Sequence, residues 1–126
     1  MIDHVLIYVS DLGYSKGFYE KIFSPLGYRI AFSDEGKFWS FDIGNGALFE
    51  IAQTQGDTEI SPVHIAFRAK EQFQVDSFYE AAISAGGKCN GAPGPRPQYT
   101  EGYYAAFILD PDGHNIESVY DAANHQ

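Results

Sequence analysis

Two histidines and two glutamates occupy matching places in this 126-residue sequence. His4 and His64 are 60 residues apart, and Glu50 and Glu117 each interrupt an apolar run late in one half of the chain. Imidazole nitrogens and carboxylate oxygens together suit divalent Ni, Co, Zn, Mn or Fe and leave one or two positions for water or substrate. An open coordination position is typical of catalysis. We therefore predict that these four side chains bind a metal ion.

The elements that would carry these residues also recur. A shift of 60 residues aligns His4 with His64 and the run Phe18-Tyr19-Glu20 with Phe78-Tyr79-Glu80, without a gap. Such self-similarity predicts one structural module used twice. Apolar patterns indicate a strand, a helix and two later strands in each half, at 5–9, 12–23, 38–43 and 47–52, and at 63–67, 72–85, 103–109 and 115–120.

A further short strand is expected directly after each helix. The predicted fold class is therefore α+β, with two tandem βαβββ modules at 1–52 and 62–120 inside a single domain, 1–126. Ser10 or Asp11 is expected to cap the first helix. Residues 53–61 are expected to form the connecting loop, and the Gly- and Pro-rich stretch 90–102 is expected to form a loop that borders a pocket.

Side chains alternate between the two faces of a strand, and one face of each leading strand is expected to pack against the helices. The opposite face then carries His4, Leu6 and Tyr8 in the first module, and His64, Ala66 and Arg68 in the second. The carboxylates of Glu50 and Glu117 are expected on that same face. Because an isolated buried carboxylate is costly, each of them calls for a compensating partner.

Composition excludes several partners. The formal net charge of −9, with eight Lys and Arg, disfavours nucleic acid and anionic membranes. Cys89 is the single cysteine, and the first residues resemble no signal peptide, so we expect a cytoplasmic protein. The longest apolar run, 103–109, is far shorter than the roughly 20 residues of a membrane-spanning helix.

Three motifs together resemble the vicinal oxygen chelate superfamily, which includes glyoxalase I, bleomycin-binding proteins, extradiol dioxygenases and fosfomycin-modifying enzymes. They are the opening His4-Val5 through Asp11-Leu12 with Phe18-Tyr19, the run Val63-His64-Ile65-Ala66-Phe67, and the run Asp110-Pro111-Asp112-Gly113-His114-Asn115-Ile116-Glu117. The resemblance covers nearly the whole chain. It implies sheets that curve around a shared cavity with a metal on its floor, and it favours a homodimer.

The resemblance also assigns roles. Dioxygenases and fosfomycin enzymes usually have two His and one Glu, matching His4, His64 and Glu117, whereas glyoxalase I adds a second carboxylate, matched by Glu50. This favours glyoxalase-type lyase or isomerase chemistry, in which two vicinal substrate oxygens chelate the metal and an enediolate forms. Glu117 would be the general base, and Glu50 a ligand or alternate base.

The sequence departs from glyoxalase I where that enzyme contacts glutathione. Tyr8 and Thr54 stand where an Arg and an Asn are usual, which argues against a glutathione thiohemiacetal. Arg68 could instead bind another anionic group. The side chains expected to contact the substrate are Arg68, Tyr8, Arg96, Tyr99 and Tyr103.

Two alternatives stay open. An Fe(II) ring-cleaving dioxygenase would use Tyr99, Tyr103 or His114 as assisting groups, although the tight turn around His114 favours a surface position for that residue. A metal-free protein that binds an antibiotic-like aromatic molecule would use Phe38, Trp39 and the many tyrosines. Metal content distinguishes these classes.

Overall fold

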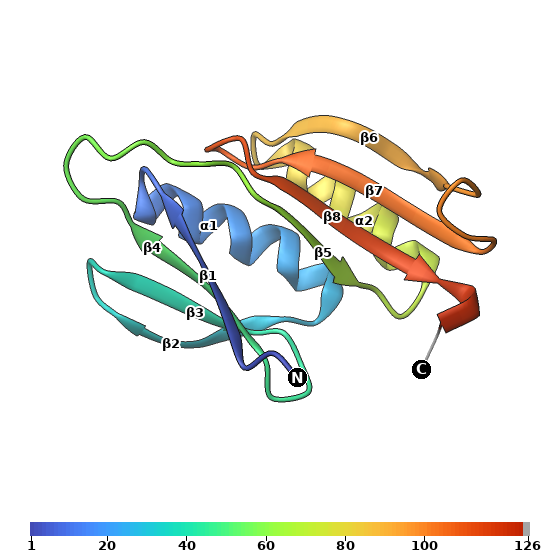
Figure 1. The fold of residues 1–126 in the computed structure, drawn as a ribbon, viewed down its shortest axis with the longest axis horizontal. Coiled ribbons are helices and arrows are strands. Elements are labelled where there is room, and N and C mark those ends of the chain that lie inside the picture. The colour runs from blue at the N-terminus through green and yellow to red at the C-terminus, as the bar shows by residue number, and fades with distance from the viewer. Residues whose placement is uncertain (125–126) are drawn as a thin grey trace.

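The computed structural model describes residues 1–124 and contains the expected repeat of elements (Figure 1). The first module comprises β1 His4–Val9, α1 Leu12–Phe23, β2 Arg29–Asp34, β3 Phe38–Asp42 and β4 Leu48–Gln53. The second comprises β5 His64–Arg68, α2 Gln72–Ser84, β6 Lys88–Pro95, β7 Tyr103–Leu109 and β8 Asn115–Asp121. Short 3-10 helices occupy Ser24–Leu26 and Ala122–Asn124. The predicted βαβββ modules are confirmed.

Each module forms one mixed sheet of four strands. The strand orders are β1-β4-β3-β2 and β5-β8-β7-β6, in which the leading strand runs parallel to the last strand of its module and the other pairs are antiparallel. The last strand therefore lies directly beside the first. In this register Leu6 is opposite Glu50, and Ala66 is opposite Glu117.

The helix-facing sides of both modules meet in one core. On β1, Ile7 and Val9 are buried while His4, Leu6 and Tyr8 are exposed, as alternation predicts. Asp11 caps α1 by accepting a hydrogen bond from the Tyr14 backbone N–H. The core continues across the two modules and includes Phe23, Phe49, Phe67, Phe78 and Ile116. None of the helices in residues 1–124 is long and apolar enough to cross a membrane.

The expected loop at 90–102 is shorter than predicted, because β6 continues to Pro95. This strand lies at the edge of its sheet, where proline is tolerated since no neighbour needs its missing N–H. Its pairing with β7 shifts register around Gly91. A side chain at Gly91 would have its Cβ 2.9 Å from the Phe107 ring at a φ of +153°, so the close approach of β6 to β7 requires glycine here.

The turn between β7 and β8 joins the second module to the first. Tyr19 of α1 donates a hydrogen bond of 2.5 Å to the buried carboxylate of Asp110, whose other oxygen accepts from the Asp112 and His114 backbone N–H groups. The Asp112 carboxylate in turn accepts from the Ser10 N–H at 3.1 Å. Burial, and then the charge of Asp110, raises the pKa of Tyr19 well above its usual range. Tyr19 therefore stays a donor.

We expect Tyr19→Phe to lower the free energy of unfolding by about 2 kcal/mol, because it removes a buried hydrogen bond to a charged group. The matched control is Tyr14→Phe, whose hydroxyl bonds the Ala85 carbonyl at an exposed position. That variant should lose no more than about 0.5 kcal/mol. Urea unfolding of both variants measures the difference. Equal losses would contradict the role given to the Asp110 turn.

Candidate functional site

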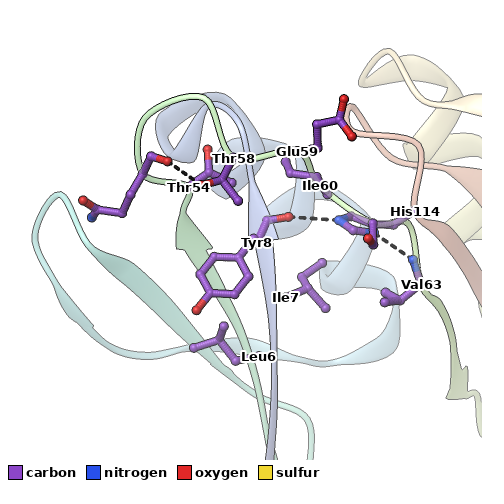
Figure 2. Close-up of a pocket in the computed structure, with 11 residues that line it drawn as sticks. Leu6, Ile7, Tyr8, Thr54, Thr58, Glu59, Ile60, Val63 and His114 are labelled. Atoms are coloured by element: carbon purple, nitrogen blue, oxygen red, sulfur yellow. Dashed lines mark hydrogen bonds between the residues drawn. The ribbon is translucent and has the colours of Figure 1, made fainter.

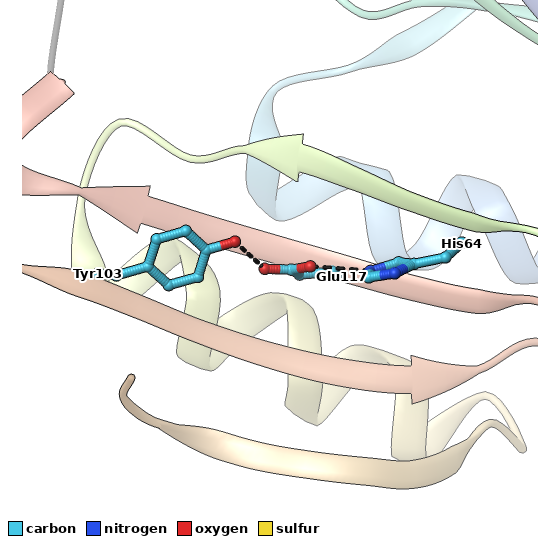
Figure 3. Close-up of polar contacts among 3 residues, drawn as sticks. All are labelled: His64, Tyr103 and Glu117. Carbon is cyan, nitrogen blue, oxygen red and sulfur yellow. Dashed lines mark hydrogen bonds and ion pairs between the residues drawn. The ribbon is translucent and has the colours of Figure 1, made fainter. Parts of the chain in front are cut away.

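His64, Glu117 and Tyr103 form a hydrogen-bonded row on the face of the second sheet that points away from the core (Figure 3). His64 Nε2 lies 2.9 Å from one oxygen of Glu117, and the Tyr103 hydroxyl donates to the other at 2.5 Å. Glu117 is only 2% exposed and lies opposite Phe107 on β7. Both of its oxygens are therefore partnered within the apolar wall that buries it.

Tyr103 is held in its protonated form. Its pKa is raised by burial and then by the hydrogen bond to Glu117. The Tyr99 ring packs against the Tyr103 ring edge to face, with centroids 5.2 Å apart, and is largely exposed. Tyr103 can thus hold the Glu117 carboxylate in place as a donor across the physiological pH range.

The equivalent pair in the first module, His4 and Glu50, is less complete. His4 is exposed, and its Nδ1 lies 2.8 Å from Asp3. The pKa of His4 is raised, first by that hydrogen bond and next by the charge of Glu50. Glu50 is 8% exposed, and no donor among residues 1–124 contacts its carboxylate. The Glu50 oxygens are not among the fully buried atoms that lack a partner, so they reach solvent and stay open to a ligand.

The four predicted ligands do not converge within one chain. Among residues 1–124, no group of three or more His, Cys, Asp or Glu side chains lies close enough together to hold a metal ion. His64 meets Glu117, and His4 lies near Glu50, but each pair is on its own sheet. The chain thus carries two half-sites, defined here as His4 with Glu50 and His64 with Glu117, and four-ligand metal binding stays a prediction.

The two arginines expected to bind substrate, Arg96 and Arg68, line separate pockets. Arg96 lines a pocket of about 400 Å³ with His64 and Tyr99, yet its guanidinium donates to the carbonyls of Ala92 and Gly94 at 2.7 and 2.8 Å. These bonds hold the Arg96 side chain against the end of its own strand, β6, beside His64. Arg68 ends β5 and lines another pocket, of about 500 Å³, with Arg29 and Lys70. Tyr8 belongs to the first module and lines a third pocket (Figure 2).

His114 is buried, so its expected surface position is wrong. It is 1% exposed; Nδ1 accepts from the Val63 N–H at 3.1 Å, which leaves the ring proton on Nε2 for donation to the Tyr8 carbonyl at 2.9 Å. The reason is that Asp110 folds the turn inward against the first module. Because both ring nitrogens are used, His114 joins the modules and is not free to assist oxygen chemistry.

Sequence reasoning missed two polar side chains beside the predicted ligands. Ser40 is fully buried opposite Glu50 in the β3–β4 register, and its hydroxyl has no hydrogen-bond partner in the described chain. The buried Oδ1 of Asn115, opposite His64, likewise has none. Each half-site therefore holds an unused polar atom. The sequence does show each of these polar residues beside apolar ones. It does not show which residue lies opposite on the next strand, because that depends on strand register.

Comparison with known proteins agrees with the fold. The sequence model of the Glyoxalase/Bleomycin resistance protein/Dioxygenase superfamily matches residues 1–118, so this chain belongs to that superfamily. No curated protein sequence matches it. A crystal structure of a glyoxalase/bleomycin resistance protein from Albidiferax ferrireducens is 27% identical, covers 95% of this chain and 98% of its own, and superposes with a TM-score of 0.84.

More distant structures show the fold alone. A lactoylglutathione lyase from Agrobacterium tumefaciens is 18% identical over 95% of this chain and 92% of its own, with a TM-score of 0.70. A glyoxalase-related enzyme from Fulvimarina pelagi is 21% identical over 95% and 87%, with a TM-score of 0.75. Similar structures therefore include enzymes, while the activity of this chain requires its own argument.

We expect Asp3→Asn to lower the pKa of His4 toward its ordinary value of about 6.5, because the hydrogen bond to Asp3 is the main cause of the upward shift. The His4 ring resonances in an NMR pH titration report this change. The control is Asp57→Asn, an exposed carboxylate in the connector, which should leave His4 unchanged. A His4 titration that is identical in the wild type and Asp3→Asn would contradict the assignment.

Proposed function

We propose that this protein is a glyoxalase-like, metal-dependent enzyme that acts on a small metabolite through two vicinal oxygens, by lyase- or isomerase-type proton transfer. The observation that supports it most is the recurrence of a His–Glu pair at equivalent places in both modules, on faces turned away from the shared core. One such pair is common in structural hydrogen bonding. Two pairs at matching positions favour a common ligand.

The donor set fits a divalent metal ion. Two imidazoles and two carboxylates are the ligand types that suit Ni, Co, Zn, Mn or Fe. The Glu50 carboxylate has no donor in the described chain and is open to a ligand, and Ser40 and Asn115 each have a buried polar atom without a partner beside a proposed ligand. Because a histidine must be neutral to bind a metal and the pKa of His4 is raised, metal binding would strengthen as pH rises.

A complete site requires a second copy of the chain. Both half-sites lie opposite the shared core, so they cannot face each other without breaking it. In a two-fold homodimer, the first half-site of each copy would face the second half-site of the other, so the dimer would contain two complete sites. We expect this dimer in the cytoplasm. A metal shared in this way would have His4, Glu50, His64 and Glu117 as its ligands.

The roles of the residues follow from their contacts. When bound, the metal would polarise a carbonyl of the chelated substrate and stabilise the enediolate left by proton loss. Glu117 is the proposed general base, since its burial and the Tyr103 hydroxyl, which donates to it, fix the carboxylate in one orientation. Tyr103 positions that carboxylate, and Glu50 serves as ligand or alternate base. Tyr99 and Arg96 border the side of the cavity beside His64.

The wild-type protein is expected to bind about one divalent metal ion per chain, and Glu117→Gln or His64→Ala should weaken that affinity at least roughly tenfold, because each removes a ligand. Glu35→Gln, at an exposed turn, is the matched control and should bind normally. Competition with a chromogenic chelator measures the affinities of Ni, Co, Zn, Mn and Fe. Unchanged affinity in Glu117→Gln would exclude that residue as a ligand.

A mixing experiment is expected to show that the ligands come from two copies. At a metal concentration that fills the wild-type sites but not those of the weakened variants, His4→Ala and His64→Ala should each stay largely empty. A mixed dimer, however, would contain one site with both substitutions and one with neither. After subunit exchange, an equimolar mixture should recover about a quarter of the wild-type metal content. No recovery, with exchange demonstrated by mass spectrometry, would contradict a metal site shared between two copies.

One observation favours the metal-free alternative, a protein that sequesters a small aromatic molecule. The pocket beside Tyr8 has a volume of about 470 Å³ and walls that include exposed apolar side chains. A wild-type protein that binds no divalent metal would make this the leading function.

For the Fe(II) dioxygenase alternative, Tyr103 and Tyr99 remain candidate assisting groups. His114 does not, because both of its ring nitrogens are already hydrogen-bonded.

A further inference from the structure

Leu6 and Tyr8 line the pocket beside Tyr8 (Figure 2), and by alternation along β1 they lie on the same face of that strand as His4. Leu6 and Tyr8 point to that face, and they are 41% and 55% exposed although both are large and apolar. They lie two and four residues from His4, which is about 7 and 13 Å along a strand. Neither His4 nor Glu50 lines the pocket, so a small molecule held at the first half-site would have to extend along β1 past Leu6 to reach it.

The opposite wall of the pocket is supplied by the connector between the modules. Thr54, Thr58, Ile60 and Val63 line it, and the Thr58 hydroxyl is already bonded to the Gln55 carbonyl at 2.8 Å. The Thr54 N–H is bonded to the Val9 carbonyl, which fixes the start of the connector to β1. The pocket thus has fixed walls with large apolar contributions.

Its charges determine what can enter. In the described chain, no Lys or Arg lines this pocket, and Glu59 lies at its rim. His114 uses Nε2 to donate to the Tyr8 carbonyl and Nδ1 to accept from the Val63 N–H, so it offers no free donor. A carboxylate placed here would lose water, gain no cation and approach the negative charge of Glu59.

We propose that this pocket binds an apolar part of the substrate that carries no negative charge, while the vicinal oxygens of the same molecule lie at the metal. This inference rests on the proposed function, and it names the substrate class for that site. A substrate with a carboxylate at its far end is excluded by the absence of a cation. Substrate length follows too, since the apolar group lies roughly 7 to 13 Å from His4 along β1.

Three hydroxamates test this, because a hydroxamate chelates a metal through two adjacent oxygens. Acetohydroxamate reports the metal site alone, octanohydroxamate adds an apolar chain, and the eight-carbon hydroxamate with a terminal carboxylate adds a charge. In cobalt(II)-loaded protein, the visible spectrum reports hydroxamate binding. We expect octanohydroxamate to bind at least tenfold more tightly than acetohydroxamate, and at least tenfold more tightly than its carboxylate analogue.

Two substitutions at Thr54 sharpen the test. Thr54→Arg supplies the missing cation and should strengthen binding of the carboxylate analogue at least tenfold, whereas Thr54→Gln, of similar length but uncharged, should not. Acetohydroxamate should bind both variants as it binds the wild type, which also shows that they are folded. Equal binding of all three probes, or tightest binding of the carboxylate analogue to the wild type, would overturn this inference alone.

Failure of the proposed function gives a different result. If acetohydroxamate leaves the cobalt spectrum of the wild type unchanged, or if no cobalt binds, the metal site is refuted and the substrate class inferred from it is refuted as well.

Discussion

A single core shared by two modules determines where the polar side chains of this protein lie. Phe67 of the second module packs edge to face against Phe23 and Phe49 of the first, with ring centroids 5.0 and 5.2 Å apart. Each sheet has two faces, and the core takes one of them. Both His–Glu pairs are therefore turned outward. The same packing that stabilises the chain keeps the two half-sites apart within the described residues.

The two half-sites are chemically unequal despite the repeat. Glu117 has an imidazole and a phenol as partners, whereas Glu50 has no donor in the described chain. Tyr103 has no counterpart that contacts Glu50. A carboxylate with two donors keeps its position without a ligand, and one with none depends more on what binds beside it. The second module thus holds its carboxylate, Glu117, in a fixed orientation, whereas the carboxylate of the first module, Glu50, has no hydrogen-bond donor in the described chain.

Much of the fold could be predicted from sequence because periodicity reports burial. The alternation along 5–9 identified the buried side chains of β1, and the gap-free repeat identified both modules. The extent of β6 was missed, since bulged pairing allows Gly and Pro where a regular strand would not. At the site, residue types indicated candidate ligands, but the contacts of each candidate depend on strand register. His114 was misplaced because its neighbours come from distant segments.

The connector that follows β4 has a consequence for how such a protein changes over time. Residues 54–63 belong to neither sheet and lie outside the regular elements, yet several of them form one wall of the pocket beside Tyr8. An insertion or deletion here would leave strand pairing and the shared core intact. Descendants of this chain can therefore change the shape of this pocket by lengthening or shortening the connector, without altering the two sheets or the shared core.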